Sequence, residues 1–278
     1  MGKLGKVGVG NWKAKVIPCG DFVNPKTILC DGFDPELIIK VPYQCFLLQN
    51  GDFNVLIDNG MHERHCGYGE KIGETTFYAT SKHFLDSLKN EGLEPDDIDL
   101  IVYTHLHADH AGNAQFFPNT KTVVQKDEYN GLLNPTFKEE LIDLFDEGTI
   151  PALQNNPNLL LIDGDFDLME GIRLITTPGH TRGHQSVLVN TVNGIRIFAG
   201  DLFHYPPCCF PWMDKLMDSD GVEHDITPMP DWPVMPGQLV FNYYDFYASV
   251  EKVKALMPEI EPQYLICGHD ASLRYRDF

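Results

Sequence analysis

Three histidines and one aspartate stand within six consecutive residues of this chain. The run Ile98–Tyr103 just before them is apolar and rich in β-branched residues, which predicts a buried strand. The side chains of His105 and His107 fall on the same side of an extended backbone, so both can reach one metal ion. Asp109 and His110 follow as the chain turns, and they can face a second ion.

Four further segments place a metal-binding side chain directly after an apolar run. These side chains are Asp58, His180, Asp201 and His269. Imidazole and carboxylate groups are the donors that Zn²⁺ and related divalent metals prefer. Polar residues that only cap loops would not explain five histidines beside three acids. The pattern therefore predicts a site for two metal ions.

Alternating strands and helices must position these side chains. Asn50–Asp52 and Asn193–Gly194 are typical of hairpin turns, whereas Gly92 and Pro258 are typical of helix ends. Several strand pairs are expected to be hairpins, which favours two mixed sheets packed face to face. The expected strands are 14–19, 42–49, 53–57, 98–104, 121–125, 158–162, 171–176, 185–191, 195–199 and 263–267, and the expected helices are 80–91, 126–132, 137–146 and 244–257.

The five motifs, in this order, resemble the metallo-β-lactamase superfamily of metallohydrolases. They span Asp58 to His269, so the resemblance covers most of the chain. It implies an α/β fold, the αββα sandwich of two mixed β-sheets with helices on the outer faces. The metals would lie at the edge where strand ends converge. Residues 1–278 are then expected to form a single domain.

The resemblance also implies a role for each residue of the motifs. It assigns seven ligands to two metals: His105, His107 and His180 to the first, Asp109, His110 and His269 to the second, and Asp201 as the bridge between them. Asp58 is expected behind these ligands, where it orients them. His184, four residues after His180 at the start of a strand, is expected either behind the ligands or as a packing residue. The implied cofactor is two Zn²⁺ per chain, and iron, manganese or cobalt suits the same donor set.

Two residue identities narrow the activity that the resemblance implies. His107 stands where flavodiiron proteins carry Glu, and Asp201 stands where many true β-lactamases carry Cys. The segments His105–Gly112 and Thr177–Ser186 look most like quorum-quenching N-acyl-homoserine lactonases. A metal-dependent hydrolase is implied, in which metal-bound hydroxide opens a lactone or cleaves a related carboxylic ester. Phosphotriester or other phosphoester hydrolysis and glyoxalase II-like thioester hydrolysis are the alternatives on the same site.

Asp109 and His204 are the expected catalytic residues. Asp109 can accept the proton of the nucleophile. Several lactonases of this kind carry Tyr three residues after the bridging Asp, as a hydrogen-bond donor to the substrate, and His204 stands there in this chain. Its imidazole could donate to the substrate oxygen in the same way, whereas the alternative is a histidine that only packs at a strand end.

Residues 203–240 are expected to form an active-site loop. Seven of the 19 prolines lie between positions 206 and 236, and large aromatic residues accompany them. Long ordered loops often cover a site, and this one follows Asp201 directly. Phe210, Trp212 and Trp232 are therefore expected to form a wall of the substrate pocket. The alternative is an excursion over the surface.

Composition limits the partners of the chain. The formal net charge of −19 over 278 residues argues against nucleic-acid partners, because binding to phosphates needs clustered Lys and Arg. No apolar run is long enough to cross a membrane, and the first residues lack the apolar core of a signal peptide. The odd number of cysteines, seven, favours free thiols in a reducing cytoplasm, including the adjacent Cys208 and Cys209. We expect a cytoplasmic monomer or homodimer that acts on a small molecule.

Overall fold

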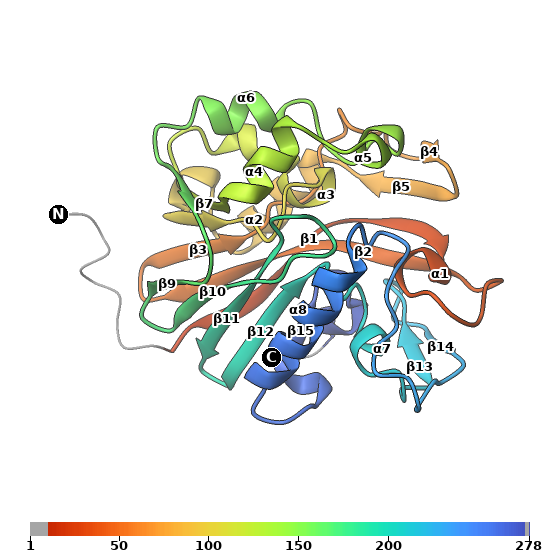
Figure 1. Cartoon of the computed structure of the whole chain (residues 1–278). Helices are drawn as coiled ribbons and strands as arrows, with labels where there is room; N and C mark the ends of the chain where they lie inside the picture. Colours follow the sequence, from red (N-terminus) through yellow and green to blue (C-terminus); the bar gives the residue numbers. More distant parts are fainter. Residues whose placement is uncertain (1–10, 276–277) are drawn as a thin grey trace.

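Two mixed β-sheets packed face to face form the centre of the chain (Figure 1). The structure is a computed structural model that describes residues 11–275 and 278. The start of the chain, on which the signal-peptide prediction rests, lies outside the described residues. The first sheet contains, in spatial order, β4 (Lys71–Ile72), β5 (Thr75–Ala79), β1 (Lys13–Pro25), β2 (Ile38–Asn50), β3 (Phe53–Ile57), β6 (Leu100–Val102), β7 (Lys121–Gln125) and β8 (Leu159–Ile162).

The second sheet is built mainly from hairpins. Its strands pair antiparallel except for one parallel pair, β12 with β15. In spatial order it contains β15 (Leu265–Cys267), β12 (Gly194–Gly200), β11 (Gln185–Thr191), β10 (Ile172–Thr176) and β9 (Phe166–Met169). A separate small hairpin is formed by β13 (Lys215–Met217) and β14 (Glu223–Asp225).

Alternation along the strands creates two apolar layers. In β3, Val55 and Ile57 pack between the two sheets, whereas Leu56 points to the opposite face and joins the outer core. This follows from the two-residue period of a strand. In β12, Phe198 lies between the sheets and Ile197 lies on the outer face. Both sheets are therefore buried on both faces.

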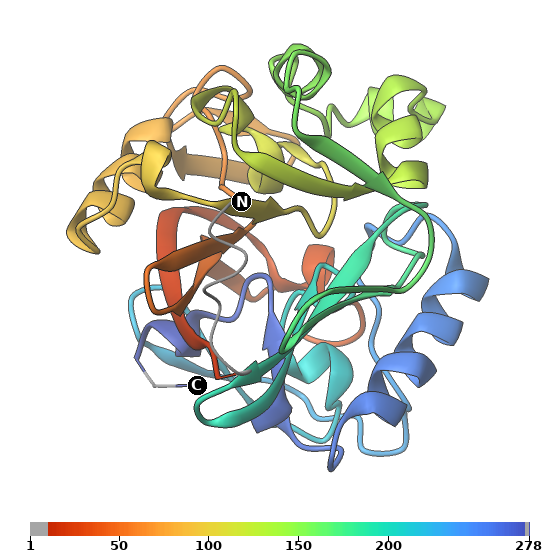
Figure 2. The same ribbon diagram turned by 90° about the vertical axis from the view of Figure 1, so that its left-hand side faces the viewer.

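Helices cover the outer faces, so the predicted sandwich with helices outside is confirmed. Phe84 and Leu88 of α2 pack into the outer core of the first sheet. Val250 and Val253 of α8 pack outside the second sheet, where Figure 2 shows this helix in blue. The helices are α1 (Lys26–Leu29), α2 (Ser81–Asn90), α3 (Ala108–Ala111), α4 (Lys126–Leu133), α5 (Phe137–Leu141), α6 (Thr149–Gln154), α7 (Pro206–Cys209) and α8 (Tyr243–Leu256).

Some predicted boundaries were wrong. The first strand does not end at Cys19, because a bulge between Pro18 and Gly20 lets β1 continue to Pro25. The helix predicted over 137–146 ends at Leu141, and Asp143 then takes a positive φ of 50°, which stops a helix. The pattern did not reveal α6, β9 or the hairpin β4–β5.

The segment 203–240, predicted as a loop, contains regular structure. It contains α7 and the hairpin β13–β14, joined by loops. Among the described residues, no helix has the length and apolar character needed to cross a bilayer.

Candidate metal centre

The predicted ligands lie where strand ends from both sheets meet. β3 and β6 are parallel neighbours, so Asp58 and the segment after Val102 leave the first sheet at the same edge. β12 and β15 are parallel neighbours in the second sheet, and Asp201 and His269 follow them. The carboxyl ends of parallel strands share one edge of a sheet.

Three imidazoles form the first cluster. The distances are 3.1 Å from His105 Nε2 to His107 Nδ1, 3.2 Å from His105 Nε2 to His180 Nε2, and 3.0 Å from His107 Nδ1 to His180 Nε2. Burial lowers the pKa of His107 to about 4 and holds the pKa values of His105 and His180 well below the usual value. Three neutral imidazoles direct ring nitrogens toward one point. Such nitrogens are typical ligands of a metal cation.

The second cluster combines imidazoles with carboxylates. Its members are Asp109, His110, Asp201 and His269, whose ligand atoms all lie within 4.8 Å of one another. The Nε2 atoms of His110 and His269 are each 3.3 Å from Asp201 Oδ1, and 3.5 and 3.7 Å from Asp109 Oδ2. This donor set of nitrogen and oxygen suits Zn²⁺, and also iron or manganese.

Asp201 lies between the two clusters. Its Oδ1 is 3.3 Å from the Nε2 atoms of His110 and His269. Its Oδ2 is 3.4 Å from His269 Nε2, 3.6 Å from His180 Nε2 and 3.9 Å from His105 Nε2, so it contacts both clusters. Burial raises the pKa of this carboxyl, but the imidazoles of His110 and His269 outweigh burial and hold the pKa well below its usual value. An ionised carboxylate between the two clusters would be able to bind metal together with both of them.

Several buried polar atoms of the clusters have no hydrogen-bond partner among the described residues. They include His110 Nε2 and Asp201 Oδ1, which face each other. Buried polar atoms are normally paired, and an unpaired one needs an explanation. Bound metal ions would supply it, so the residues present fit a two-metal site.

Asp58 and His184 lie behind the clusters, as expected for positioning residues. Asp58 accepts hydrogen bonds from the backbone N–H and the hydroxyl of Thr104, at 2.7 and 2.8 Å, and lies 2.8 Å from His110 Nδ1. This contact leaves His110 Nε2 facing the second cluster. His184 Nε2 accepts from the backbone N–H of Asp201 at 3.1 Å, and its Nδ1 contacts the carbonyl of Thr177 at 3.0 Å.

The sequence reading missed Glu128 of α4. Its buried carboxyl group accepts from the backbone N–H of Leu106 at 2.9 Å, the hydroxyl of Thr181 at 2.5 Å and the backbone N–H of Gly183 at 3.1 Å. It therefore joins the loop that carries His105 and His107 to the loop that carries His180. Burial raises the pKa of Glu128 to about 7. No local signal marked this residue, because an acid near the start of a helix is usually solvated.

His204 also lies beside the two clusters, but it does not line the cavity among the described residues. Its side chain is 2% exposed, and its Nε2 is 3.4 Å from Asp201 Oδ2. Burial lowers its pKa to about 4, so the ring is neutral. With His180 and Asp201 it forms a third group whose ligand atoms lie within 4.8 Å of one another. The structure thus places His204 against the proposed bridging carboxylate.

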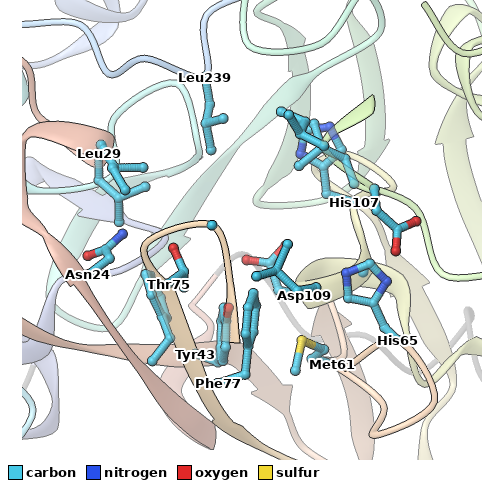
Figure 3. A pocket seen from close by; sticks show the side chains of 18 of the residues that line it. Asn24, Leu29, Tyr43, Met61, His65, Thr75, Phe77, His107, Asp109 and Leu239 are labelled. Atoms are coloured by element: carbon cyan, nitrogen blue, oxygen red, sulfur yellow. The ribbon is translucent and has the colours of Figure 1, made fainter. Parts of the chain in front are cut away.

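A cavity of about 400 Å³ opens beside the second cluster (Figure 3). Asp109, Asp201 and His269 line its inner end. Its walls are mostly apolar and come from β1, β2, the hairpin β4–β5 and the loops around them. They include Phe22, Leu29, Tyr43, Met61, Phe77 and Leu239.

The predicted aromatic wall does not fit this cavity. Among the described residues that line it, none of Phe210, Trp212 and Trp232 is present. Phe210 is buried in the outer apolar core, while Trp212 and Trp232 are about half exposed at the surface. The chain turns away from the cavity after His204 and returns only near Leu239, so the ends of the segment 203–240 approach the site and its middle does not.

Comparison with known proteins decides the family. A sequence profile described as "Metallo-beta-lactamase superfamily" matches residues 39–269. The chain belongs to this superfamily. An N-acyl homoserine lactonase from Bacillus thuringiensis is 32% identical over 187 residues, which cover 64% of this chain and 70% of that protein. N-acyl homoserine lactonase AiiB from Agrobacterium fabrum is 31% identical over 98 residues, which cover 33% of this chain and 36% of that protein.

Solved structures support the same superfamily fold. A quorum-quenching N-acyl homoserine lactone hydrolase has a TM-score of 0.74 and 25% identity, with 98% of both chains covered. AidC, a dizinc quorum-quenching lactonase, has a TM-score of 0.62 and 19% identity, with 90% of this chain and 84% of that chain covered. The predicted relationship to the superfamily and its lactonases is confirmed. Asp58 and all seven predicted ligands lie within the matched region.

Proposed function

We propose that this metal-dependent hydrolase opens lactones, with N-acyl-homoserine lactones as its substrate class, using two zinc ions. The single observation that carries the proposal is Asp201, whose buried carboxylate lies between two donor clusters and contacts both, beside a mostly apolar cavity. Relatives that share the superfamily fold are N-acyl homoserine lactonases by name.

The two clusters define which residues would hold the ions. His105, His107 and His180 would hold one, Asp109, His110 and His269 the other, and Asp201 both. When bound, two such ions supply a Lewis acid for the carbonyl oxygen and lower the pKa of water to about 7. Zinc fits the imidazole-rich donor set, and iron, manganese or cobalt would fit it too.

Asp109 is the residue best placed to move a proton. Its side chain is 21% exposed and lines the cavity, whereas the side chain of Asp201 is 4% exposed. A carboxylate there can accept a proton from the attacking water and return it to the leaving oxygen. Water adds to the carbonyl carbon, the ring C–O bond breaks, and the products are a carboxylic acid and a hydroxyl group.

The cavity walls favour a substrate with an apolar tail. Leu29, Phe77 and Leu239 line the cavity on different sides of Asp109 (Figure 3). Apolar walls with a few polar groups at one end are typical of sites for small amphipathic ligands. An acyl chain would lie along the walls and its lactone ring at the carboxylates. Among the residues that line the cavity, no arginine or lysine would pair with a phosphoester or with glutathione.

The proposal includes a cytoplasmic location, a monomer or homodimer, and no nucleic-acid partner. All seven cysteines are buried and free, as is usual in a reducing compartment. The net charge of −19 opposes binding to phosphate backbones.

A substrate panel tests the proposal. Purified protein loaded with zinc would be assayed with N-hexanoyl-homoserine lactone, an unsubstituted γ-lactone, an aryl ester, a glutathione thioester and a phosphotriester. We expect the acyl lactone to give the highest kcat/KM. Asp201→Asn serves as the inactive control. A phosphotriester or thioester that reacts faster than every lactone would contradict the proposal.

A further inference from the structure

We propose that the hydroxyl of Tyr43 is the hydrogen-bond donor that the chain offers to the substrate oxygen gaining charge during ester cleavage. This inference rests on the proposed function, because it assumes an ester or lactone in the cavity. Tyr43 belongs to β2, which is distant in sequence from all the candidate ligands.

Strand β2 places Tyr43 beside the second cluster. The carbonyl oxygen of Pro42 lies 2.9 Å from His269 Nδ1, a contact that leaves His269 Nε2 facing Asp109 and Asp201. Tyr43 is the next residue, and its ring is 6.0 Å from the ring of His269 in an edge arrangement. The backbone that orients this candidate ligand therefore also positions the phenol.

Neighbouring aromatic rings fix the orientation of Tyr43. Its ring stacks on Phe22 at 4.5 Å and lies nearly parallel to Phe77 at 6.5 Å. The residue is only 4% exposed, so its ring has little freedom to turn away. In Figure 3, the hydroxyl points from beside Phe77 toward the side of the cavity where Asp109 lies. A donor held in place before the substrate arrives costs little reorganisation during the reaction.

Tyr43 lines the cavity, and its hydroxyl has no hydrogen-bond partner among the described residues. Tyr103 makes a useful contrast, because it is equally buried but its hydroxyl accepts a hydrogen bond from the Asn59 side chain at 2.6 Å. A buried tyrosine hydroxyl usually has a partner. For Tyr43, the partner available on the open side is a molecule in the cavity.

His204 is the rival donor, and its geometry is less suitable. Its Nε2 faces Asp201 Oδ2, and a Cβ added to Gly237 would lie 3.1 Å from its Nδ1, so the ring is enclosed on that side as well. His204 does not line the cavity among the described residues, whereas Tyr43 does. The phenol is thus the group that can reach a substrate oxygen without a rearrangement.

The test replaces Tyr43 by Phe, which keeps the ring stack and removes only the hydroxyl. We expect kcat to fall about 100-fold with little change in KM, because loss of one such donor typically costs that much. Zinc content, measured by elemental analysis, should stay at the wild-type value. Tyr78→Phe is the matched control, since Tyr78 is the next residue after Phe77 on β5 and does not line the cavity. It should keep wild-type kinetics.

The assay should use the ester or lactone that the wild type hydrolyses fastest. A wild type inactive on lactones but active on another ester contradicts the proposed function, while the ratio of Tyr43→Phe to wild type still decides this inference. A kcat within twofold of wild type would overturn it and leave Tyr43 as an apolar wall. A raised KM at unchanged kcat would also overturn it. No turnover of any ester would overturn both proposals.

Discussion

Oδ2 of Asp58 lies 2.8 Å from Nδ1 of His110, although the two residues come from different loops of the first sheet. The other oxygen of Asp58 accepts from the backbone of Thr104. One carboxylate thus fixes both the rotation of a candidate ligand and the start of the loop that carries three others. Contacts of this kind behind a metal ligand set its orientation and basicity.

Asp58→Ala should weaken binding at the second cluster. The variant removes the acceptor for His110 Nδ1, so we expect metal affinity to fall about 10–100-fold. Competition with a chromophoric chelator would measure this change. Asp52→Asn, an exposed substitution in the turn before β3, is the control and should bind metal like the wild type. Equal affinities for Asp58→Ala and wild type would contradict the positioning role.

Elemental analysis should find two transition-metal ions per chain after reconstitution. Asp109→Asn should then lower kcat by about 10²–10⁴-fold, because the amide cannot accept the proton of water. Circular dichroism would check that the fold is kept. A single ion per chain would contradict the two-cluster site, and a metal-replete Asp109→Asn with near-normal kcat would contradict the role of Asp109.

Phe77→Ala should change acyl-chain preference, because this ring forms part of the cavity wall. We expect the ratio of kcat/KM between decanoyl and butanoyl homoserine lactones to change about tenfold. Trp212→Ala should leave the ratio unchanged, because Trp212 is 53% exposed and does not line the cavity among the described residues. The reverse result would restore the aromatic wall predicted from the sequence.

Glu128 should make stability depend on pH. Its pKa rises from 4.5 in the unfolded chain to about 7 in the fold, so the folded state binds more protons between these values. The carboxyl therefore stabilises the fold most below pH 4.5, and this contribution is lost as pH rises through 7. The difference in pKa corresponds to about 3 kcal/mol.

Urea unfolding of metal-loaded wild type and Glu128→Gln at pH 5 and pH 8 would measure this effect. The unfolding free energy of wild type relative to Glu128→Gln should decrease from pH 5 to pH 8. Asp127→Asn, the exposed neighbour on α4, controls for the loss of a carboxyl group and should show no such trend. A constant difference between wild type and Glu128→Gln would mean that the Glu128 carboxyl has an ordinary pKa.

The candidate ligands could be chosen from the sequence because each lies beside a strand whose pattern is local. His105 and His107 directly follow a short apolar run, and the alternation of β3 marks the end that carries Asp58. The sandwich followed from the same strand and hairpin signals. These features depend on neighbours a few residues away, so one sequence is enough to find them.

Other features depend on contacts between distant segments, and no local pattern reports them. In the sequence, Glu128 resembles an acid on the solvent-exposed side of a helix. Only the fold brings Thr181 and Gly183 within hydrogen-bond distance of it. In the sequence, Tyr43 cannot be told from any other aromatic residue of a strand. Only the pairing of β1 with β2 and β5 shows which residues surround it. The position of Trp212 and Trp232 away from the cavity has the same origin, since only the path of the chain decides which aromatic residues face it.

The candidate ligands come from both halves of the chain: four follow β6 in the first sheet, and three follow β10, β12 and β15 in the second. An ion held by residues of both halves would join the two sheets and would bind the folded chain far better than the unfolded one. At a free metal concentration 100 times the dissociation constant, such binding adds about 2.7 kcal/mol to stability. Metal scarcity in the cell would then reduce the amount of folded protein as well as its turnover, and metal supply would help set how long each molecule survives proteolysis.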